Sequence, residues 1–384
     1  MLTNEKKKLA MLLFFLSISV SVIAQGVVIP MTQGENYNEL LASGQVKIAG
    51  KPLNMIFRTG GYGISLSKAI SKVGNTCDCE QGHKEVATSP QRRRFEKRSA
   101  ATCGIPDMSV SIGNGLSGSG PVCALAAKED SLLPGGYDGV FALPSPFIKD
   151  HPFKEMFSSI PGGIIGMYWD TRLSVADSHG ELHFGAIPKN KVSDAKWAPL
   201  DEDEVYWRIK ASSVTYEEET VNPTLKTVID TSVHYGGFEK SIFDLIVKTL
   251  GAKLDSATNR YIVPSYDEIP DGKFSLKISR TTIQFNAYDL VEYDFDSAKV
   301  FLGCKLTTRY NVIGTAILSN YDVLLDYNLK QIGFTAPSLK NLKRPFDATS
   351  DFMSGAYSQG TSSPYFSSSE SDTDSPARKT RKTY

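Results

Sequence analysis

The sequence predicts an all-β fold with two lobes, each with its own hydrophobic core. The chain has 384 residues, and 41% of them are hydrophobic, which is enough for two cores. Its 31 glycines and 19 prolines favour many turns between short strands. A weak internal repeat indicates two related halves: an apolar run ending in x-Thr-small occurs at residues 57–60 and again at 229–232. Each copy is later followed by an apolar–small turn, at 140–143 and at 312–315.

The N-terminus has the pattern of a secretory signal peptide over residues 1–24. Residues 6–8 are lysines, residues 10–24 are mostly apolar, and the small residues Val22 and Ala24 allow cleavage before Gln25. A membrane anchor is the alternative, but an apolar run of about 15 residues is short of the roughly 20 that span a bilayer. We therefore expect cleavage, no membrane span afterwards, and a secreted protein in the extracellular space or the endolysosomal lumen.

We expect the mature chain to have four segments. A short polar lead covers residues 25–36, an N-terminal β lobe residues 37–205, and a C-terminal β lobe residues 206–340. The tail at residues 341–384 is rich in serine and threonine and is expected to be disordered.

Short alternating runs predict the strands of both lobes. They lie at residues 45–48, 55–57, 107–114, 182–187 and 207–216, followed by strands and turns from 274 to 334, and residues 113–120 form a Gly/Ser-rich turn. Residues 238–250 predict a helix, because five apolar residues line one face and Gly251 follows as a stop signal.

Four of the five cysteines lie in the N-terminal half, and the secretory compartment permits disulfides. The candidates are Cys77, Cys79, Cys103 and Cys123; the pairing stays open, with Cys77 and Cys79 each expected to reach one of the other two. Cys304 is left as a buried free thiol. A zinc site at residues 77–79 is the alternative, but its ligand spacing is incomplete, so no metal or cofactor is expected.

Two turns carry a resemblance to a known family. Residues 55–61 read Met-Ile-Phe-Arg-Thr-Gly-Gly, and residues 227–232 read Thr-Val-Ile-Asp-Thr-Ser. With the segments at 137–143, 180–185, 197–200, 312–315 and 320–334, they resemble the pepsin-like aspartic peptidases (peptidase A1) over residues 37–337. The resemblance implies a bilobal acid-protease fold, with a substrate cleft between two β lobes and short helices.

The chain departs from this family at the first turn. In the family two aspartates share one proton, because like charges a few ångströms apart raise one pKa. Arg58 replaces the first aspartate, whereas Asp230 matches the second. A guanidinium neither accepts nor donates a proton at working pH, and we expect it to pair with Asp230 and hold it ionised.

Further differences lie beside the two aspartate positions. The resemblance gives Thr59, Gly60, Thr231 and Ser232 a role in supporting the turns. The family's following Ser or Thr, which bonds the aspartate, is replaced by Gly61 and Val233, so a supporting hydroxyl is expected to be missing. Ser232 stands where glycine fits a tight turn more easily, and no flap motif is found between residues 79 and 110.

The histidines do not suggest a metal centre. His179 and His183 are four apart, but Gly180 between them argues against a helix and a shared metal face, so surface positions are expected. His234 is close to Asp230 and is expected to be a hydrogen-bonded turn residue.

These observations predict a secreted, catalytically inactive peptidase homologue that binds peptides or a protein partner in its cleft. The alternative is a divergent endopeptidase, active at acid pH, with Asp230 as its surviving catalytic aspartate. A third possibility is an inhibitor or decoy of a true peptidase, with residues 92–98 as the contact; a solvated surface loop explains that basic segment as well. The formal net charge of zero gives no reason to expect nucleic acid, and we expect a monomer.

Overall fold

The computed structural model describes residues 26–33, 40–59, 63–67, 104–113, 115–124, 136–148, 151, 153–169, 179–202, 206–294 and 297–337. Every described element belongs to the first of the chain's two units, Met1–Leu342. The predicted signal peptide, the cysteines at 77, 79 and 103, Gly60 and Gly61, the 92–98 segment and the tail all lie outside the described residues.

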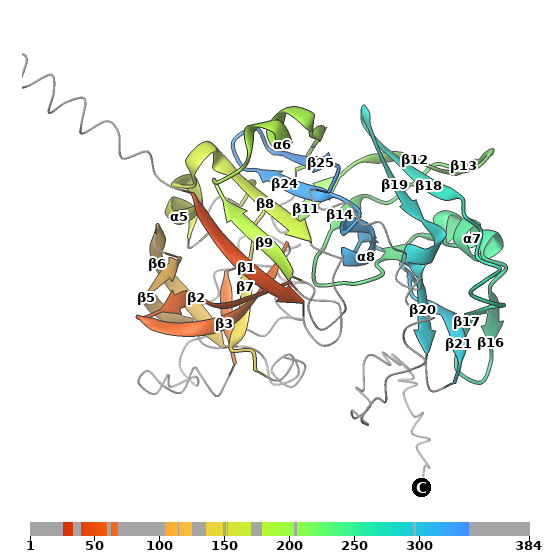
Figure 1. Ribbon diagram of the computed structural model, residues 1–384, viewed down its shortest axis with the longest axis horizontal. Helices are drawn as coiled ribbons and strands as arrows, with labels where there is room; N and C mark the ends of the chain where they lie inside the picture. Colours follow the sequence, from red (N-terminus) through yellow and green to blue (C-terminus); the bar gives the residue numbers. More distant parts are fainter. Residues whose placement is uncertain are drawn as a thin grey trace, which may run out of the picture. The chain divides into compact units, whose positions relative to one another are not determined.

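Among the described residues, the largest sheet has twelve strands and includes both β1 and β25, the first and last strands along the chain (Figure 1). In spatial order they are β10 (Lys196–Pro199), β25 (Gln331–Thr335), β24 (Asp322–Asp326), β8 (Ile164–Trp169), β9 (His179–Phe184), β1 (Val27–Gln33), β2 (Leu40–Ile48), β3 (Lys51–Arg58), β7 (Gly139–Ala142), β4 (Ile64–Leu66), β6 (Leu116–Ala124) and β5 (Gly104–Ile112). Strands β24 and β8 pair antiparallel, so the C-terminal part of the chain is bonded directly to the N-terminal half.

Three smaller sheets are built from the second half alone. The five-stranded sheet has the order β11 (Trp207–Ile209), β14 (Thr227–Ile229), β23 (Asn311–Ile313), β15 (Gly237–Phe238) and β22 (Lys305–Leu306). The next has the order β13 (Glu219–Val221), β12 (Ala211–Tyr216), β18 (Lys273–Ile278) and β19 (Thr281–Asn286). The last has the order β16 (Lys253–Asp255), β17 (Arg260–Val263), β21 (Lys299–Leu302) and β20 (Val291–Asp294).

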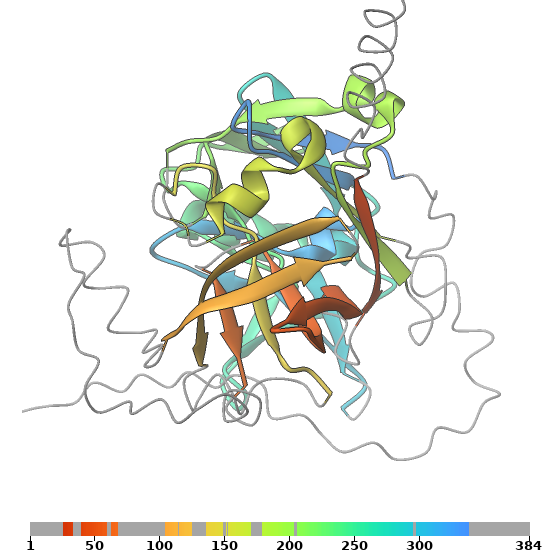
Figure 2. The same ribbon diagram turned by 90° about the vertical axis from the view of Figure 1, so that its left-hand side faces the viewer.

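The described helices are short and lie between strands. They are α5 (Lys154–Ser158), α6 (Lys189–Asp194), α7 (Lys240–Thr249), α8 (Thr315–Leu318) and the 3₁₀ turns η1 (Pro161–Gly163) and η3 (Ala287–Leu290). Helix α5 covers the β5–β6 hairpin (Figure 2), where Met156 Cβ lies 3.0 Å from the position that a Cβ on Gly118 would take. None of the helices among the described residues is both long enough and apolar enough to span a bilayer. The predicted all-β fold class is confirmed.

The internal repeat appears as two copies of one strand topology. In the first, β3 runs parallel to β7, which is antiparallel to β4, and β4 is parallel to β6. In the second, β14 runs parallel to β23, which is antiparallel to β15, and β15 is parallel to β22. Each copy therefore has one strand, β3 or β14, leading into one of the two turns found in the sequence.

The buried apolar side chains of the two halves join into one cluster rather than two separate cores. Phe57 stacks on Phe141 in the first half with 5.1 Å between ring centroids, and Phe274 stacks on Phe285 in the second at 5.3 Å. Tyr327 joins the halves, because its ring contacts Phe157 of α5 and Trp207 of β11. The expectation of a separate core for each lobe was wrong because β24, β25 and β10 extend the sheet of the other half.

Local differences from the sequence expectations have simple causes. The predicted 238–250 helix is α7, and it starts two residues later because Phe238 pairs in β15. Gly251 ends it with φ +58°, a conformation that favours glycine. The predicted 113–120 turn is shorter than expected: Gly113 and Gly115 are turn residues, whereas Leu116 to Gly120 pair with β5 as part of β6.

Candidate functional site

Two buried threonines tie the turns after β3 and β14 together. The backbone N–H of Thr59 donates to Thr231 Oγ1 at 3.1 Å, and the N–H of Thr231 donates to Thr59 Oγ1 at 3.0 Å. Each hydroxyl then donates to the carbonyl two residues before the other threonine, at Ile229 O (3.1 Å) and at Phe57 O (3.5 Å). The four bonds are reciprocal, so they relate the two turns residue by residue.

This relationship makes Arg58 and Asp230 equivalent positions. Arg58 directly precedes Thr59 and follows Phe57, whose carbonyl accepts the Thr231 hydroxyl. In the same way, Asp230 directly precedes Thr231 and follows Ile229, whose carbonyl accepts the Thr59 hydroxyl. Arg58 ends β3 and Asp230 follows β14, and both are partly buried. Asp230 N donates to Ile313 O at 3.1 Å, which ties its backbone to β23.

The Asp230 carboxylate is held by Ser232. Its Oδ1 accepts the Ser232 backbone N–H at 2.9 Å and the Ser232 hydroxyl at 2.5 Å. The expectation of a missing hydroxyl was therefore wrong for this turn, because the hydroxyl comes from one position earlier than expected. Ser232 is not among the described residues with positive φ, so its backbone conformation does not favour glycine over serine.

The segment behind Asp230 is packed against the start of α8. A Cβ on Gly314 would lie 2.2 Å from His234 O, so only glycine allows this close approach. Thr315 N donates to Val233 O at 2.8 Å and Ala316 N to His234 O at 3.0 Å. The His234 ring joins the same contact, because its Nδ1 lies 3.0 Å from Thr315 Oγ1. Burial lowers the pKa of His234 to about 4, which keeps the ring neutral above that pH.

The bases of β14 and β23 are fixed by a polar cluster that sequence analysis missed. Glu239 is 6% exposed and Asn311 is 1% exposed, and Asn311 Nδ2 donates to Glu239 Oε2 at 3.2 Å. Neither residue has a local motif; Glu239 appears in the sequence as an ordinary acidic residue before a helix.

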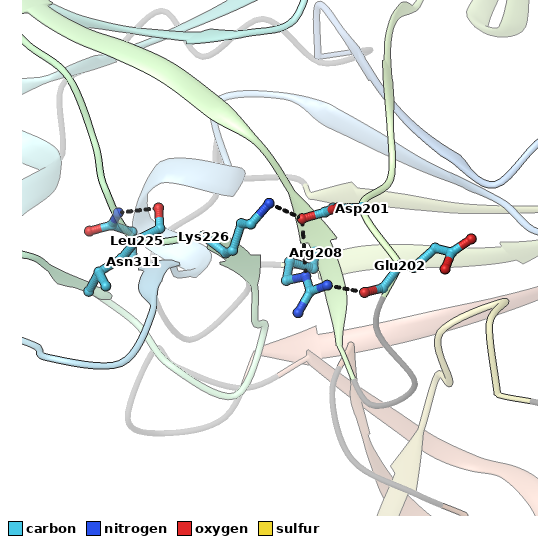
Figure 3. A network of polar contacts seen from close by, with 6 residues as sticks. All are labelled: Asp201, Glu202, Arg208, Leu225, Lys226 and Asn311. Atoms are coloured by element: carbon cyan, nitrogen blue, oxygen red, sulfur yellow. Dashed lines mark hydrogen bonds and ion pairs between the residues drawn. The ribbon is translucent and has the colours of Figure 1, made fainter. Parts of the chain in front are cut away.

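A second polar contact braces β14 from the solvent side (Figure 3). Lys226 Nζ lies 2.5 Å from Asp201 Oδ2, and Arg208 Nε lies 3.5 Å from the same oxygen. Arg208 also donates to the carbonyl of Glu202. The hydrogen bond from Lys226 lowers the pKa of Asp201, so this carboxylate stays ionised at neutral pH. The brace joins the connection before β11 to the start of β14.

The remaining sequence candidates lie away from the turns. His179 and His183 are in β9; His183 Nδ1 lies 3.0 Å from Ala186 O and Nε2 lies 2.7 Å from Glu181 Oε2, so His183 is partly buried rather than a surface residue. Across the part of the chain that the structure describes, no group of three or more potential metal ligands occurs. Cys304 is a buried free thiol as expected, and burial raises its pKa.

Of the disulfide candidates, only Cys123 lies within the described residues. Its backbone is in β6, opposite Ser65 of β4 and Gly104 of β5. The pairing expected for it stays a prediction, as does an ion pair between Arg58 and Asp230.

Comparison with known proteins identifies the family. No curated protein matches the chain significantly. A family model described as eukaryotic aspartyl protease matches residues 125–337, more than half of the chain. The matched span includes Asp230, Ser232 and Gly314, whereas Arg58 and Thr59 precede it. The all-β architecture and the two joined turns agree with this match, and the chain belongs to the eukaryotic aspartyl protease family.

Proposed function

We propose that this chain is a secreted, monomeric pseudopeptidase that binds a peptide or a protein partner between its two halves without cutting it. One observation carries the proposal: the reciprocal bonds of Thr59 and Thr231 make Arg58 the counterpart of Asp230. Secretion to the extracellular space or the endolysosomal lumen is supported by the signal pattern at residues 1–24.

The chemistry explains why Arg58 argues against hydrolysis. Acid proteolysis of this type needs two carboxylates that share one proton, so that one activates water and the other protonates the substrate carbonyl. A guanidinium stays protonated at working pH and can do neither. The Asp230 Oδ1 already accepts two hydrogen bonds from Ser232, which leaves one carboxylate oxygen for any new partner.

Binding a peptide does not require the two carboxylates that hydrolysis requires. An extended peptide can attach to strand edges by backbone hydrogen bonds, with side-chain pockets adding specificity. A guanidinium beside such a peptide favours a carboxylate, because the two groups can form charge-assisted hydrogen bonds. We therefore propose an acidic peptide segment as the ligand at Arg58.

A cleavage assay tests the proposal. Purified mature protein is incubated with a diverse fluorogenic peptide library from about pH 3 to pH 7, beside Asp230→Ala. We expect no cleavage above that of the variant at any pH. Cleavage that disappears in Asp230→Ala would overturn the pseudopeptidase proposal.

A binding assay tests the ligand class. Acidic and neutral peptide pools are compared for binding to the wild-type protein, to Arg58→Ala and to Arg280→Ala, a matched change at an exposed arginine. We expect Arg58→Ala alone to lose the preference for acidic peptides. Equal binding of acidic peptides by Arg58→Ala and the wild type would show that Arg58 is not part of the binding site.

The alternative function is a divergent acid endopeptidase. Two observations favour it: the family match includes Asp230, and Ser232 holds that carboxylate in one orientation. It requires a second carboxylate in place of the one that Arg58 replaces. The Asp230→Ala comparison above separates this function from the proposed one.

A further inference from the structure

Glu239 is the N-cap residue of α7, but its side chain does not cap that helix. Its carboxylate makes no side-chain capping bond to α7 and turns instead toward the loop before β14. It accepts the backbone N–H of Leu225 at 2.6 Å and that of Thr224 at 2.9 and 3.0 Å. The hydroxyls of Ser241 (3.0 Å) and Thr224 (3.2 Å) also donate to it. Most of its hydrogen bonds therefore come from the loop, and the one from the Ser241 hydroxyl comes from the first turn of α7.

These bonds keep the Glu239 carboxylate charged although it is buried. Burial by itself would raise the pKa of Glu239, but the donors at Thr224, Leu225, Ser241 and Asn311 outweigh this effect and lower it. Several backbone N–H groups that donate to one carboxyl group stabilise its ionised form over its protonated form. The groups around Glu239 therefore stabilise an ionised carboxylate at this position.

Asn311 connects the same carboxylate to the second strand. Its Oδ1 accepts the Glu239 backbone N–H at 2.7 Å, and its Nδ2 donates to Leu225 O at 3.2 Å as well as to Glu239. Its own backbone N–H donates to Lys226 O at 2.8 Å. Figure 3 shows the Asn311 amide pointing at the Leu225 carbonyl, beside the Lys226–Asp201 contact.

Glu239 and Asn311 together are called the clamp below. The position of the clamp relative to Asp230 indicates what it does. Strands β14 and β23 have three residues each and run parallel in the register Thr227 to Asn311 and Ile229 to Ile313. The clamp holds the entry to both strands, and Asp230 and Gly314 follow directly at their exits. Three residues of strand cover only about 10 Å, so a shift at the entry is carried to the turn.

We infer that Glu239 and Asn311 are positioning residues for the Asp230 turn, acting as a buried clamp on the two strands that carry it. The inference deepens the proposed function and rests on it for the effect on binding, because the Asp230 turn is bonded to the turn that carries Arg58. The exposed Lys226–Asp201 pair contributes less, because both side chains are 30% exposed or more and solvent screens such pairs.

Hydrogen exchange in the protein without ligand tests the clamp. Glu239→Gln keeps the size but points an NH₂ group at backbone donors, so the clamp loses acceptors that it needs. We expect exchange of the Asp230, Thr231 and Thr315 amides to speed up by on the order of tenfold or more, while amides of β18 and β19 change less than about twofold.

Glu219→Gln is the matched control, since Glu219 is 45% exposed and pairs with Lys248 at 2.5 Å on the outer side of α7. It should leave exchange at the Asp230 turn unchanged. Ser241→Ala removes a single donor to Glu239 and should give a smaller increase at the same amides. This milder variant decides the question if Glu239→Gln does not fold.

Faster exchange at Thr224 and Leu225 with unchanged exchange at Asp230 and Thr231 would overturn the inference. That result would make the clamp a purely local contact. The exchange measurement needs no ligand, so a failure to find any binding peptide would count against the proposed function and not against the clamp. Where a binding peptide is found, Glu239→Gln should weaken its binding and Glu219→Gln should not.

Discussion

Thr59 and Thr231 are 172 residues apart in sequence, and each donates its backbone N–H to the other's hydroxyl oxygen. The two side chains are almost completely buried, at 0% and 1% exposure. The Thr59 hydroxyl also donates to a carbonyl of β14, and the Thr231 hydroxyl donates to a carbonyl of β3. The pair therefore joins the two halves of the repeat at the place where Arg58 and Asp230 lie.

Removing one of these hydroxyls should destabilise the fold. Thr231→Val keeps the shape but leaves the Thr59 N–H without its acceptor in a buried place, and we expect a loss of about 1–3 kcal/mol in the free energy of unfolding. Urea denaturation measures it. Thr282→Val, at an exposed position of β19, is the control and should change stability by less than about 0.5 kcal/mol. An equal effect of both changes would contradict a special role for the pair.

Restoring the carboxylate at position 58 should not restore peptidase activity. Arg58→Asp supplies the charge, but the first turn continues with Gly60 and Gly61 and offers no side-chain hydroxyl like that of Ser232. The expected outcome is no cleavage of the fluorogenic library at any pH from about 3 to 7. Appreciable turnover by this single variant would show that the arginine alone separates the chain from an active peptidase.

The buried His234 should make the protein less stable in acid. Its pKa is lowered by burial from 6.5 unfolded to about 4 folded. The unfolded state therefore binds more protons, so the stability contribution is complete above pH 6.5 and is lost as the pH falls to about 4. We expect His234→Asn, which can still bond Thr315, to reduce the stability difference between pH 7 and pH 4 by about 3 kcal/mol. Urea titrations at both pH values measure it, and an unchanged difference would contradict a neutral buried ring.

Asp289 should have the opposite pH dependence. Burial raises its pKa from 3.8 to about 6, although Asn286 N and Asn320 Nδ2 donate to its Oδ2 at 2.7 and 2.8 Å. A raised folded pKa means that stability is highest below pH 3.8 and is lost as the pH rises through 6. Between pH 4 and pH 7, the free energy of unfolding of Asp289→Asn should therefore rise by about 2 kcal/mol relative to that of the wild type. The same urea titrations test this, and a difference independent of pH would show that Asp289 ionises normally.

Several features could be predicted from local sequence. The strand patterns, the face of α7 and its end at Gly251 follow from side-chain periodicity and backbone preference, which act over a few residues. The repeat of the two turns was visible because Thr59 and Thr231 sit in similar short motifs. The family resemblance depended on the order of such motifs, and the family match bears it out.

Other features depend on contacts between distant segments. Nothing near Ser232 shows that its hydroxyl turns back to Asp230, and the sequence suggested that this aspartate had no such partner. Glu239 and Asn311 are 72 residues apart, and their clamp forms only when β14 and β23 pair in parallel. The merging of the two cores likewise requires β24 to pair with β8.

The sequence by itself determined the strand-rich class, the repeat and the presence of an arginine at position 58, because each is a property of neighbouring residues or of residue identity. Only the tertiary structure decided which groups hold Asp230 and how the turn after Arg58 is bonded to the turn after Asp230. Hydrogen bonds between residues 72 and 172 positions apart set these positions, and no local pattern encodes the partner of a buried polar group.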